Sequence, residues 1–392
     1  MTNRRTHRSC HLGLRTPFLL IATILAFLLL CEVDFPASPS TENRSDSSRG
    51  ISWRASAAAS PIQTVEQEGR RKKKKKKSDD DDDSDGTRVI NARPTPPFTI
   101  PPAVPDKRYL YFIAMGDWGT GSRAQQHVAE LMNAKAGRDS LHFVLLLGDN
   151  FYDKGVKAVD DPQWSRKFES MYDLPFLNVP FFASLGNHDY KTAGSPAAQV
   201  EYSKRNTKWR LPARYYTFTR NVDQAAIQFF ALDTEAIVTR KWYEFTGNQL
   251  DWLESELQKS QAAWKVVFGH HPVFSNGDHG DTREIKEQVR PLLEKYGIDF
   301  YFCGHDHDRQ LLQPLQGVNY IVSGTAAKSR DTAWADNTIF AAADLGFVWC
   351  RVSAEAFHVQ FINKNGEIEF AYTVNKAEQR AGGKAADKES GQ

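Results

Sequence analysis

The 392-residue chain is poor in cysteine and in net charge. It has four cysteines, of which Cys10 and Cys31 lie in the opening segment. The remaining pair, Cys303 and Cys350, is too small for a disulfide framework in a large domain, so we expect buried free thiols. A formal net charge of +2 shows no bias toward nucleic acid, and none is expected as a partner.

Long apolar runs are also scarce. A basic opening precedes an apolar run from Phe18 to Leu30. Its length of about 13 residues suits a secretory signal and falls short of the roughly 20 residues of a membrane-spanning helix. Residues 1–33 are therefore predicted to be a signal peptide that directs the protein into the secretory pathway, for secretion or delivery to vesicles. Because no small-x-small cleavage site follows, an uncleaved membrane anchor at residues 18–30 is the alternative.

Residues 34–105 have the composition of a linker. Arg70 to Lys77 reads RRKKKKKK, Ser78 to Asp85 reads SDDDDDSD, and a proline-rich stretch follows. Like charges repel and cannot bury a core, so we predict a solvated spacer whose two charge blocks nearly cancel. Nuclear import, a polyanion contact and a processing site are the alternatives. The polar residues 379–392 are predicted to form a frayed tail.

Residues 106–378 are predicted to form one catalytic domain of the α/β class, because short apolar strands alternate with helical patterns. The last three strands follow one another without helices, which suggests an antiparallel part of a sheet. The predicted strands are 108–115, 142–147, 226–232, 264–269, 299–304, 318–324, 347–353, 357–362 and 367–373.

Three helices are predicted in this domain, over 122–136, 246–260 and 281–297. In the second, Leu250, Leu253 and Leu257 share one face. In the third, Asp281 is the expected N-cap, with Glu284 three residues later.

Five strand ends carry residue types that bind metals. Each apolar run stops at a glycine or a short turn, and a ligand-type residue comes next. Loops at the carboxyl ends of strands are where α/β sheets place their sites. One Gly-Asp or Gly-His pair is common, whereas five such ends in one domain indicate a metal site. The segments read MGDWG, LGDNFY, LGNHD, FGHHP and CGHDHD, beginning at residues 115, 147, 185, 268 and 303.

These donors define the kind of metal. Carboxylates, an amide, imidazoles and a phenol suit hard to borderline cations, and the lack of a thiolate cluster disfavours structural zinc. The donors are too numerous for one ion and fit two that share a bridging carboxylate. Two ions about 3.5 to 4 Å apart can clamp the attacking and leaving oxygens of an in-line displacement at phosphorus.

The ordered set GDWG, GDNFY, GNHD, GHHP and GHDH resembles the calcineurin-like metallophosphoesterase superfamily. Within it, the chain is similar to the small, animal-type purple acid phosphatases, also called tartrate-resistant acid phosphatases. The resemblance runs from Lys107 to Thr373 and includes ALDT, QLDWLESEL and DHG. It implies a metallophosphoesterase-type αββα sandwich, in which two mixed β-sheets are flanked by helices.

The resemblance also implies residue roles. Asp149 would bridge two metals, a ferric ion and a divalent iron, zinc or manganese. Two histidines, His188 and His279, would face the substrate, and His271 would lie next to the ligands. The ferric ligands would be Asp117, Tyr152 and His307, and the divalent ligands Asn187, His270 and His305.

Tyr152 distinguishes this chain within the superfamily. A phenol has a normal pKa of about 10 and binds poorly until a highly charged ion removes its proton. The related serine/threonine phosphatases lack this tyrosine and carry a GDxxDRG loop, whereas this loop reads GDNFYDKG.

The expected function is an acid phosphatase that hydrolyses phosphate monoesters through a metal-bound hydroxide, with His188 or His279 as proton donor.

Two other functions stay open from the sequence. The first is a catalytically weak, phosphatase-like scaffold of the secretory or membrane system. The second keeps the fold and acts on nucleotides or phosphodiesters. In each case we expect a monomer.

Overall fold

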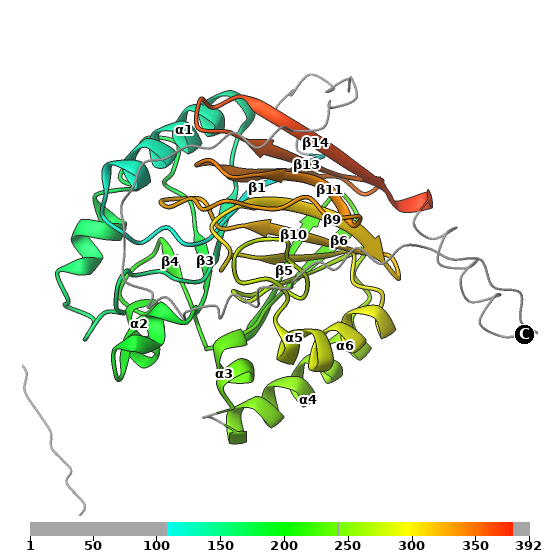
Figure 1. Cartoon of the computed structure of the whole chain (residues 1–392), viewed down its shortest axis with the longest axis horizontal. Coiled ribbons are helices and arrows are strands. Elements are labelled where there is room, and N and C mark those ends of the chain that lie inside the picture. The colour runs from blue at the N-terminus through cyan, green and yellow to red at the C-terminus, as the bar shows by residue number, and fades with distance from the viewer. Residues whose placement is uncertain (1–107, 241–242, 379–392) are drawn as a thin grey trace, which may run out of the picture. The chain divides into compact units, whose positions relative to one another are not determined.

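The computed structural model describes residues 108–240 and 243–378. The predicted signal segment, linker and tail (1–33, 34–105 and 379–392) lie outside the described residues. Within the described part, two seven-stranded mixed sheets pack together, with helices against their outer faces (Figure 1). The predicted α/β sandwich is confirmed.

The strands and helices have the following bounds. The strands are β1 (Leu110–Met115), β2 (Phe143–Leu147), β3 (Phe181–Ser184), β4 (Trp209–Arg210), β5 (Tyr216–Val222), β6 (Ala225–Ala231), β7 (Trp264–Phe268), β8 (Phe300–Cys303), β9 (Arg309–Leu315), β10 (Val318–Ser323), β11 (Thr338–Ala342), β12 (Phe347–Val352), β13 (Ala356–Ile362) and β14 (Ile368–Asn375). The helices are α1 (Arg123–Asp139), α2 (Ser195–Tyr202), α3 (Thr234–Thr239), α4 (Tyr243–Lys259), α5 (Arg283–Gln288) and α6 (Arg290–Lys295), with a π-helical turn at Trp164–Glu169 and a 3-10 turn at His188–Lys191.

Each sheet has parallel strands at its centre. The first sheet has the order β14-β13-β12-β1-β2-β3-β4, and the second has the order β11-β9-β10-β8-β7-β6-β5. Strands β1 to β4 are mutually parallel, as are β6, β7, β8 and β10. Strands β12 to β14 pair antiparallel, as predicted for the C-terminal segments. The parallel strands of each sheet therefore end at a common edge.

Aromatic side chains fill the space between the sheets. Phe112 of β1 meets Phe229 of β6 edge to face, with ring centroids 5.5 Å apart, and Phe302 of β8 at 6.1 Å. Phe143 of β2 contacts Phe229 at 5.3 Å. All four side chains are fully buried. Their large apolar area makes this interface the main core of the domain.

Helices cover the outer face of each sheet. Helix α1 buries Val128 and Met132 in the core of the first sheet. Helices α3 to α6 form a second core with β6, β7, β8 and β10, and Leu253 and Leu257 of α4 belong to it, as the predicted apolar face requires. Figure 1 shows these four helices gathered on one side of the second sheet.

The predicted helix over 281–297 is wrong in detail. It is two short helices, α5 and α6, that meet at Val289. Pro291 has no N–H and clashes with the preceding turn, so the helix restarts there. Thr282, and not Asp281, is the N-cap residue. The Asp281 carboxylate accepts a hydrogen bond from the backbone N–H of Ser275 at 3.0 Å, so it anchors the preceding loop.

Cys303 and Cys350 are free and buried, as predicted. Across residues 108–240 and 243–378, the helices are too short or too polar to span a bilayer.

Candidate metal centre

The five strand ends converge on one site shared by both sheets. Asp117, Asp149 and Asn187 follow β1, β2 and β3 of the first sheet. His270 and His305 follow β7 and β8 of the second sheet. The backbone N–H of His305 donates to Asp117 Oδ2 at 2.9 Å, which joins the two groups of loops directly.

One half of the site contains a phenol, a carboxylate and an imidazole. Tyr152 Oη donates to Asp117 Oδ1 at 2.8 Å and lies 3.1 Å from His307 Nε2. His307 Nε2 is 3.4 Å from the same Asp117 oxygen. Three donor atoms from loops far apart in sequence therefore surround one small volume.

The other half contains an amide and two imidazoles. His270 Nε2 lies 3.0 Å from Asn187 Oδ1, 3.1 Å from His305 Nδ1 and 3.5 Å from Asp149 Oδ1. His270 Nδ1 donates to the carbonyl of Leu147 at 2.9 Å. Because a carbonyl can only accept, this bond leaves the lone pair of His270 on Nε2, the nitrogen that faces the centre.

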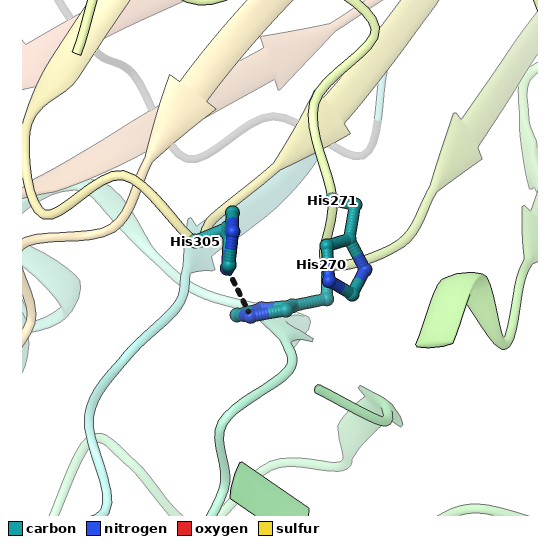
Figure 2. A group of neighbouring side chains, drawn as sticks. All are labelled: His270, His271 and His305. Atoms are coloured by element: carbon teal, nitrogen blue, oxygen red, sulfur yellow. Dashed lines mark hydrogen bonds between the residues drawn. The ribbon is translucent and has the colours of Figure 1, made fainter. Parts of the chain in front are cut away.

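The two halves are contiguous. Single ligand atoms of Asp117, Asp149 and His270 lie within 4.8 Å of one another, and the same holds for His270, His271 and His305 (Figure 2). All seven predicted donors are therefore brought together.

The backbone is strained at three of these positions. Asp117, Asp149 and His305 have φ values of 59°, 51° and 71°, in the left-handed region that non-glycine residues rarely adopt. Such strain persists only where surrounding structure over-determines it, and it clusters at functional sites. Here it turns each side chain back toward the common volume.

Glycine is required beside two of the carboxylates. A Cβ atom on Gly186 would overlap Asp149 Oδ1, and one on Gly304 would overlap Asp117 Oδ2. The loops can approach the carboxylates only because these two residues lack a side chain. The backbone of a loop from each sheet therefore lies in close contact with a carboxylate of the site.

The electrostatics of the Tyr152 half favour a highly charged cation. Burial raises the pKa of Tyr152 well above its normal value, and the charges of Asp117 and Asp149 raise it further. Burial also raises the pKa of Asp117, but the hydrogen bond from His307 and the charges of His270 and His307 outweigh it, so the net pKa is lowered. An ionised carboxylate therefore lies beside a phenol that only a strong Lewis acid could deprotonate.

The histidine half is suited to a borderline cation. Burial lowers the pKa of His305 well below its normal value, and neighbouring imidazoles lower it further, so its ring is neutral and can act as a ligand. Burial also lowers the pKa of His270, but Asp149 and Asp117 reverse the shift and raise it. The chemistry of the complete donor set therefore fits two metal ions of different hardness.

The two predicted substrate-facing histidines flank the centre. The His188 ring lies 4.4 Å from the Tyr152 ring, and its Nε2 is 4.0 Å from Asp149 Oδ2. Burial lowers the pKa of His188, the charge of Asp149 opposes this, and the charge of nearby Lys191 lowers the pKa further. The His279 ring stacks on the His305 ring with centroids 4.3 Å apart.

Three basic residues near the centre were not predicted. Lys191 Nζ lies 3.0 Å from His188 Nε2, Arg330 Nη1 lies 3.4 Å from His279 Nε2, and Lys328 Nζ lies 4.3 Å from the centroid of the Tyr152 ring. Single basic residues in loops form no recognisable motif, so the sequence offers no signal for them. They place positive charge beside the centre, and Arg330 also pairs with Asp278, whose Oδ2 lies 3.7 Å from Arg330 Nη1.

Two residues of the strand-end motifs turn away from the centre. Asn150 Nδ2 donates to the carbonyl of Ser184 at 2.7 Å. Asp189 accepts hydrogen bonds from the backbone N–H groups of Gly186 and Asn150, at 2.8 and 3.1 Å. These bonds tie the loops after β2 and β3 together beneath the donors.

The fold is shared with a solved protein that is described as an anchor. The structure of GAP50, the anchor in the inner membrane complex of Plasmodium, matches with a TM-score of 0.64 and 23% identity, over 70% of this chain and 94% of that one. At this identity the match demonstrates the fold alone.

Sequence comparison identifies closer relatives. The chain is 36% identical over 236 residues to tartrate-resistant acid phosphatase type 5 of Oryctolagus cuniculus, covering 55% of this chain and 72% of that protein. It is 34% identical to purple acid phosphatase 17 of Arabidopsis thaliana, covering 56% and 68%. The family model for calcineurin-like phosphoesterases matches residues 110–309. The chain therefore belongs to the calcineurin-like phosphoesterase family, as a metal-dependent phosphatase whose relatives include tartrate-resistant and purple acid phosphatases.

Proposed function

We propose that the protein is an acid phosphatase that hydrolyses phosphate monoesters at a dinuclear centre of one ferric ion and one divalent iron, zinc or manganese. One observation carries the proposal: two carboxylates, a phenol, an amide and three imidazoles from both sheets face one another at hydrogen-bonding distances. This mixture of donors suits one hard and one borderline cation.

The ferric ion is assigned to the Tyr152 half, with Asp117 and His307. The reason is the phenol itself, because its normal pKa is about 10 and a trivalent ion is best able to remove its proton. The divalent ion is assigned to Asn187, His270 and His305, and Asp149 would serve as a shared ligand. When bound, the two ions would supply an activated water and neutralise charge on the phosphate.

The remaining residues of the centre bind and orient the substrate. A phosphate dianion is attracted by Lys191, Lys328 and Arg330, which place positive charge beside the centre. The Lys191 ammonium lies within hydrogen-bonding distance of His188 Nε2, so the two side chains act together on one side of the phosphate. On the other side, the His279 ring stacks on His305, and in its protonated form it can donate a proton to the leaving alcohol.

Location in the secretory pathway belongs to the same proposal, since it depends on the predicted signal segment at residues 1–33. Expression with an epitope tag at the C-terminus, followed by imaging and by N-terminal sequencing of the mature protein, would test it. A protein that retains residues 18–30 and pellets with membranes would favour the anchor alternative.

Metal analysis of the purified full chain tests the catalytic proposal. We expect two metal ions per chain, a visible charge-transfer band and hydrolysis of p-nitrophenyl phosphate at acid pH. A folded protein that stays colourless, metal-free and inert after reconstitution with iron and zinc would contradict it. Capture of membrane partners by such an inert protein would favour the scaffold alternative. A preference for nucleotides or diesters in a substrate panel would favour the alternative of a nucleotide- or phosphodiester-specific enzyme.

A further inference from the structure

We infer that His271 is a positioning residue for the divalent ion: Thr234 and Glu235 hold its ring in one tautomer, and that ring in turn holds the imidazole of His305. The inference deepens the proposed function and rests on it. His271 directly follows the ligand His270 at the end of β7, and its side chain is buried.

The hydroxyl of Thr234 determines which nitrogen of His271 carries the proton. Its oxygen accepts the backbone N–H groups of His270 and His271, at 3.1 and 3.0 Å. Both lone pairs of the oxygen are then used, so its single O–H must donate to His271 Nδ1, 2.9 Å away. Thr234 is fully buried, and water does not compete for these bonds.

The proton of neutral His271 is consequently on Nε2. This nitrogen is 3.5 Å from Glu235 Oε2, a long contact that a charged acceptor can still orient. An N–H cannot bind a cation, so His271 is not itself a ligand, although it belongs to a group of three histidines with the spacing of a metal site. Its role must be exerted through its neighbours.

The ring of His271 packs against the two imidazole ligands. Its centroid is 4.5 Å from that of His305 and 4.9 Å from that of His270, where the rings meet at 82° (Figure 2). The His279 ring also packs against the His305 ring, with centroids 4.3 Å apart. Rotation of His305 is therefore obstructed by both neighbours, which keeps its Nδ1 directed at the divalent position.

Thr234 and Glu235, which hold the His271 ring, come from a sixth strand end that has no predicted metal ligand of its own. Thr234 and Glu235 form the first turn of α3, directly after β6, the neighbour of β7 in the second sheet. Asp233 caps this turn by accepting the Ala236 N–H at 3.3 Å. Groups that orient metal ligands typically change metal affinity about 10-fold to 100-fold when removed.

Release of metal to a chelator tests the inference on the full, metal-loaded protein. Iron and zinc retained by each variant are measured over time by mass spectrometry. For Thr234→Val and His271→Ala we expect the divalent ion to be released about 10-fold to 100-fold faster, with the ferric ion and its visible band unchanged. Thr234→Ser keeps the hydroxyl and should behave as wild type. Thr217→Val is the matched control, because the hydroxyl of Thr217 in β5 donates to the backbone carbonyl of Phe229 at 2.8 Å.

The outcomes separate the inference from the proposed function. Wild-type rates of zinc release from folded Thr234→Val and His271→Ala would overturn the inference alone, as would equal acceleration for both ions. If Thr234→Val does not fold, His271→Ala decides. A wild-type protein that never binds two ions would remove the proposed function and the inference together.

Discussion

The two β-sheets contribute different chemistry to the candidate metal centre. The first sheet supplies oxygen donors, namely Asp117, Asp149, Tyr152 and Asn187, from the ends of β1, β2 and β3. The second sheet supplies the imidazoles, His270, His305 and His307, from the ends of β7 and β8. In each half of the site, oxygen and nitrogen donors are mixed, so neither sheet could build either half alone.

The site therefore depends on how the sheets pack. The contact between the His305 N–H and Asp117 Oδ2 crosses between them at the centre. A second contact between the sheets is made by Arg309 of β9. Its side chain donates to the carbonyl of Ile362 in β13 at 2.9 Å and to Glu369 in β14 at 3.0 Å. The phosphatase function is accordingly coupled to the stability of the sheet interface.

Substitution of the shared carboxylate should have the largest effect. Asp149→Asn removes the charge that faces both halves, so both ions should be lost and kcat/KM should fall by about 10³-fold or more, roughly 4 kcal/mol. Metal analysis and p-nitrophenyl phosphate kinetics would measure this. The exposed Asp173 offers a control as Asp173→Asn. Retention of two ions by Asp149→Asn would contradict the shared position.

Removal of an aromatic ring between the sheets should lower the stability of the domain. Phe112 is fully buried and contacts Phe229 and Phe302 of the opposite sheet. Phe112→Ala should lower the free energy of unfolding by about 3 to 4 kcal/mol. Urea denaturation measures the loss, with Phe176→Ala as control, since Phe176 is 53% exposed. A loss below 1 kcal/mol would mean that the interface is not the main core.

Loss of the phenol should affect one half of the centre only. Tyr152→Phe should abolish the visible band and lower activity by about 10-fold to 100-fold, while zinc in the histidine half is retained. Absorption spectra and metal analysis would distinguish the halves. The control is Tyr372→Phe, because Tyr372 donates to Asn319 at 3.1 Å, outside the centre. An unchanged spectrum would refute the assignment of Tyr152.

The smallest expected effect concerns His358 in the first sheet. Burial, and then the charge of Arg351, lowers the pKa of His358 to about 4 in the folded protein. The unfolded chain binds this proton at higher pH, so stability should fall as the pH decreases from about 6.5 to about 4. Partial exposure of the ring reduces the effect.

His358→Gln should gain stability relative to wild type over that pH range. Urea midpoints at pH 7, 5.5 and 4 would measure the difference, with the exposed His127→Gln as control. A difference between wild type and His358→Gln that does not change with pH would contradict the shifted titration.

Several features could not be predicted from the sequence because they depend on contacts between distant segments. Thr234 lies 37 residues from His271, and nothing in ALDT indicates that its hydroxyl holds a histidine. Lys191 and Arg330 belong to loops without a recognisable pattern. The break between α5 and α6 is different, because Pro291 is a local signal that predicts a break in the helix.

The α/β class, most of the strands and the five strand ends with ligand-type residues followed from local pattern, whereas the choice of seven donors among those residues came from the resemblance to the metallophosphoesterases. An apolar run predicts a buried strand, and a glycine with a ligand-type residue after it predicts a turn at the strand's carboxyl end. The contacts that bring the donors of both sheets together, and the residues that hold their rings, are decided by the packing of one sheet on the other. Hydrogen bonds and ring contacts across that interface join residues that chain order keeps far apart.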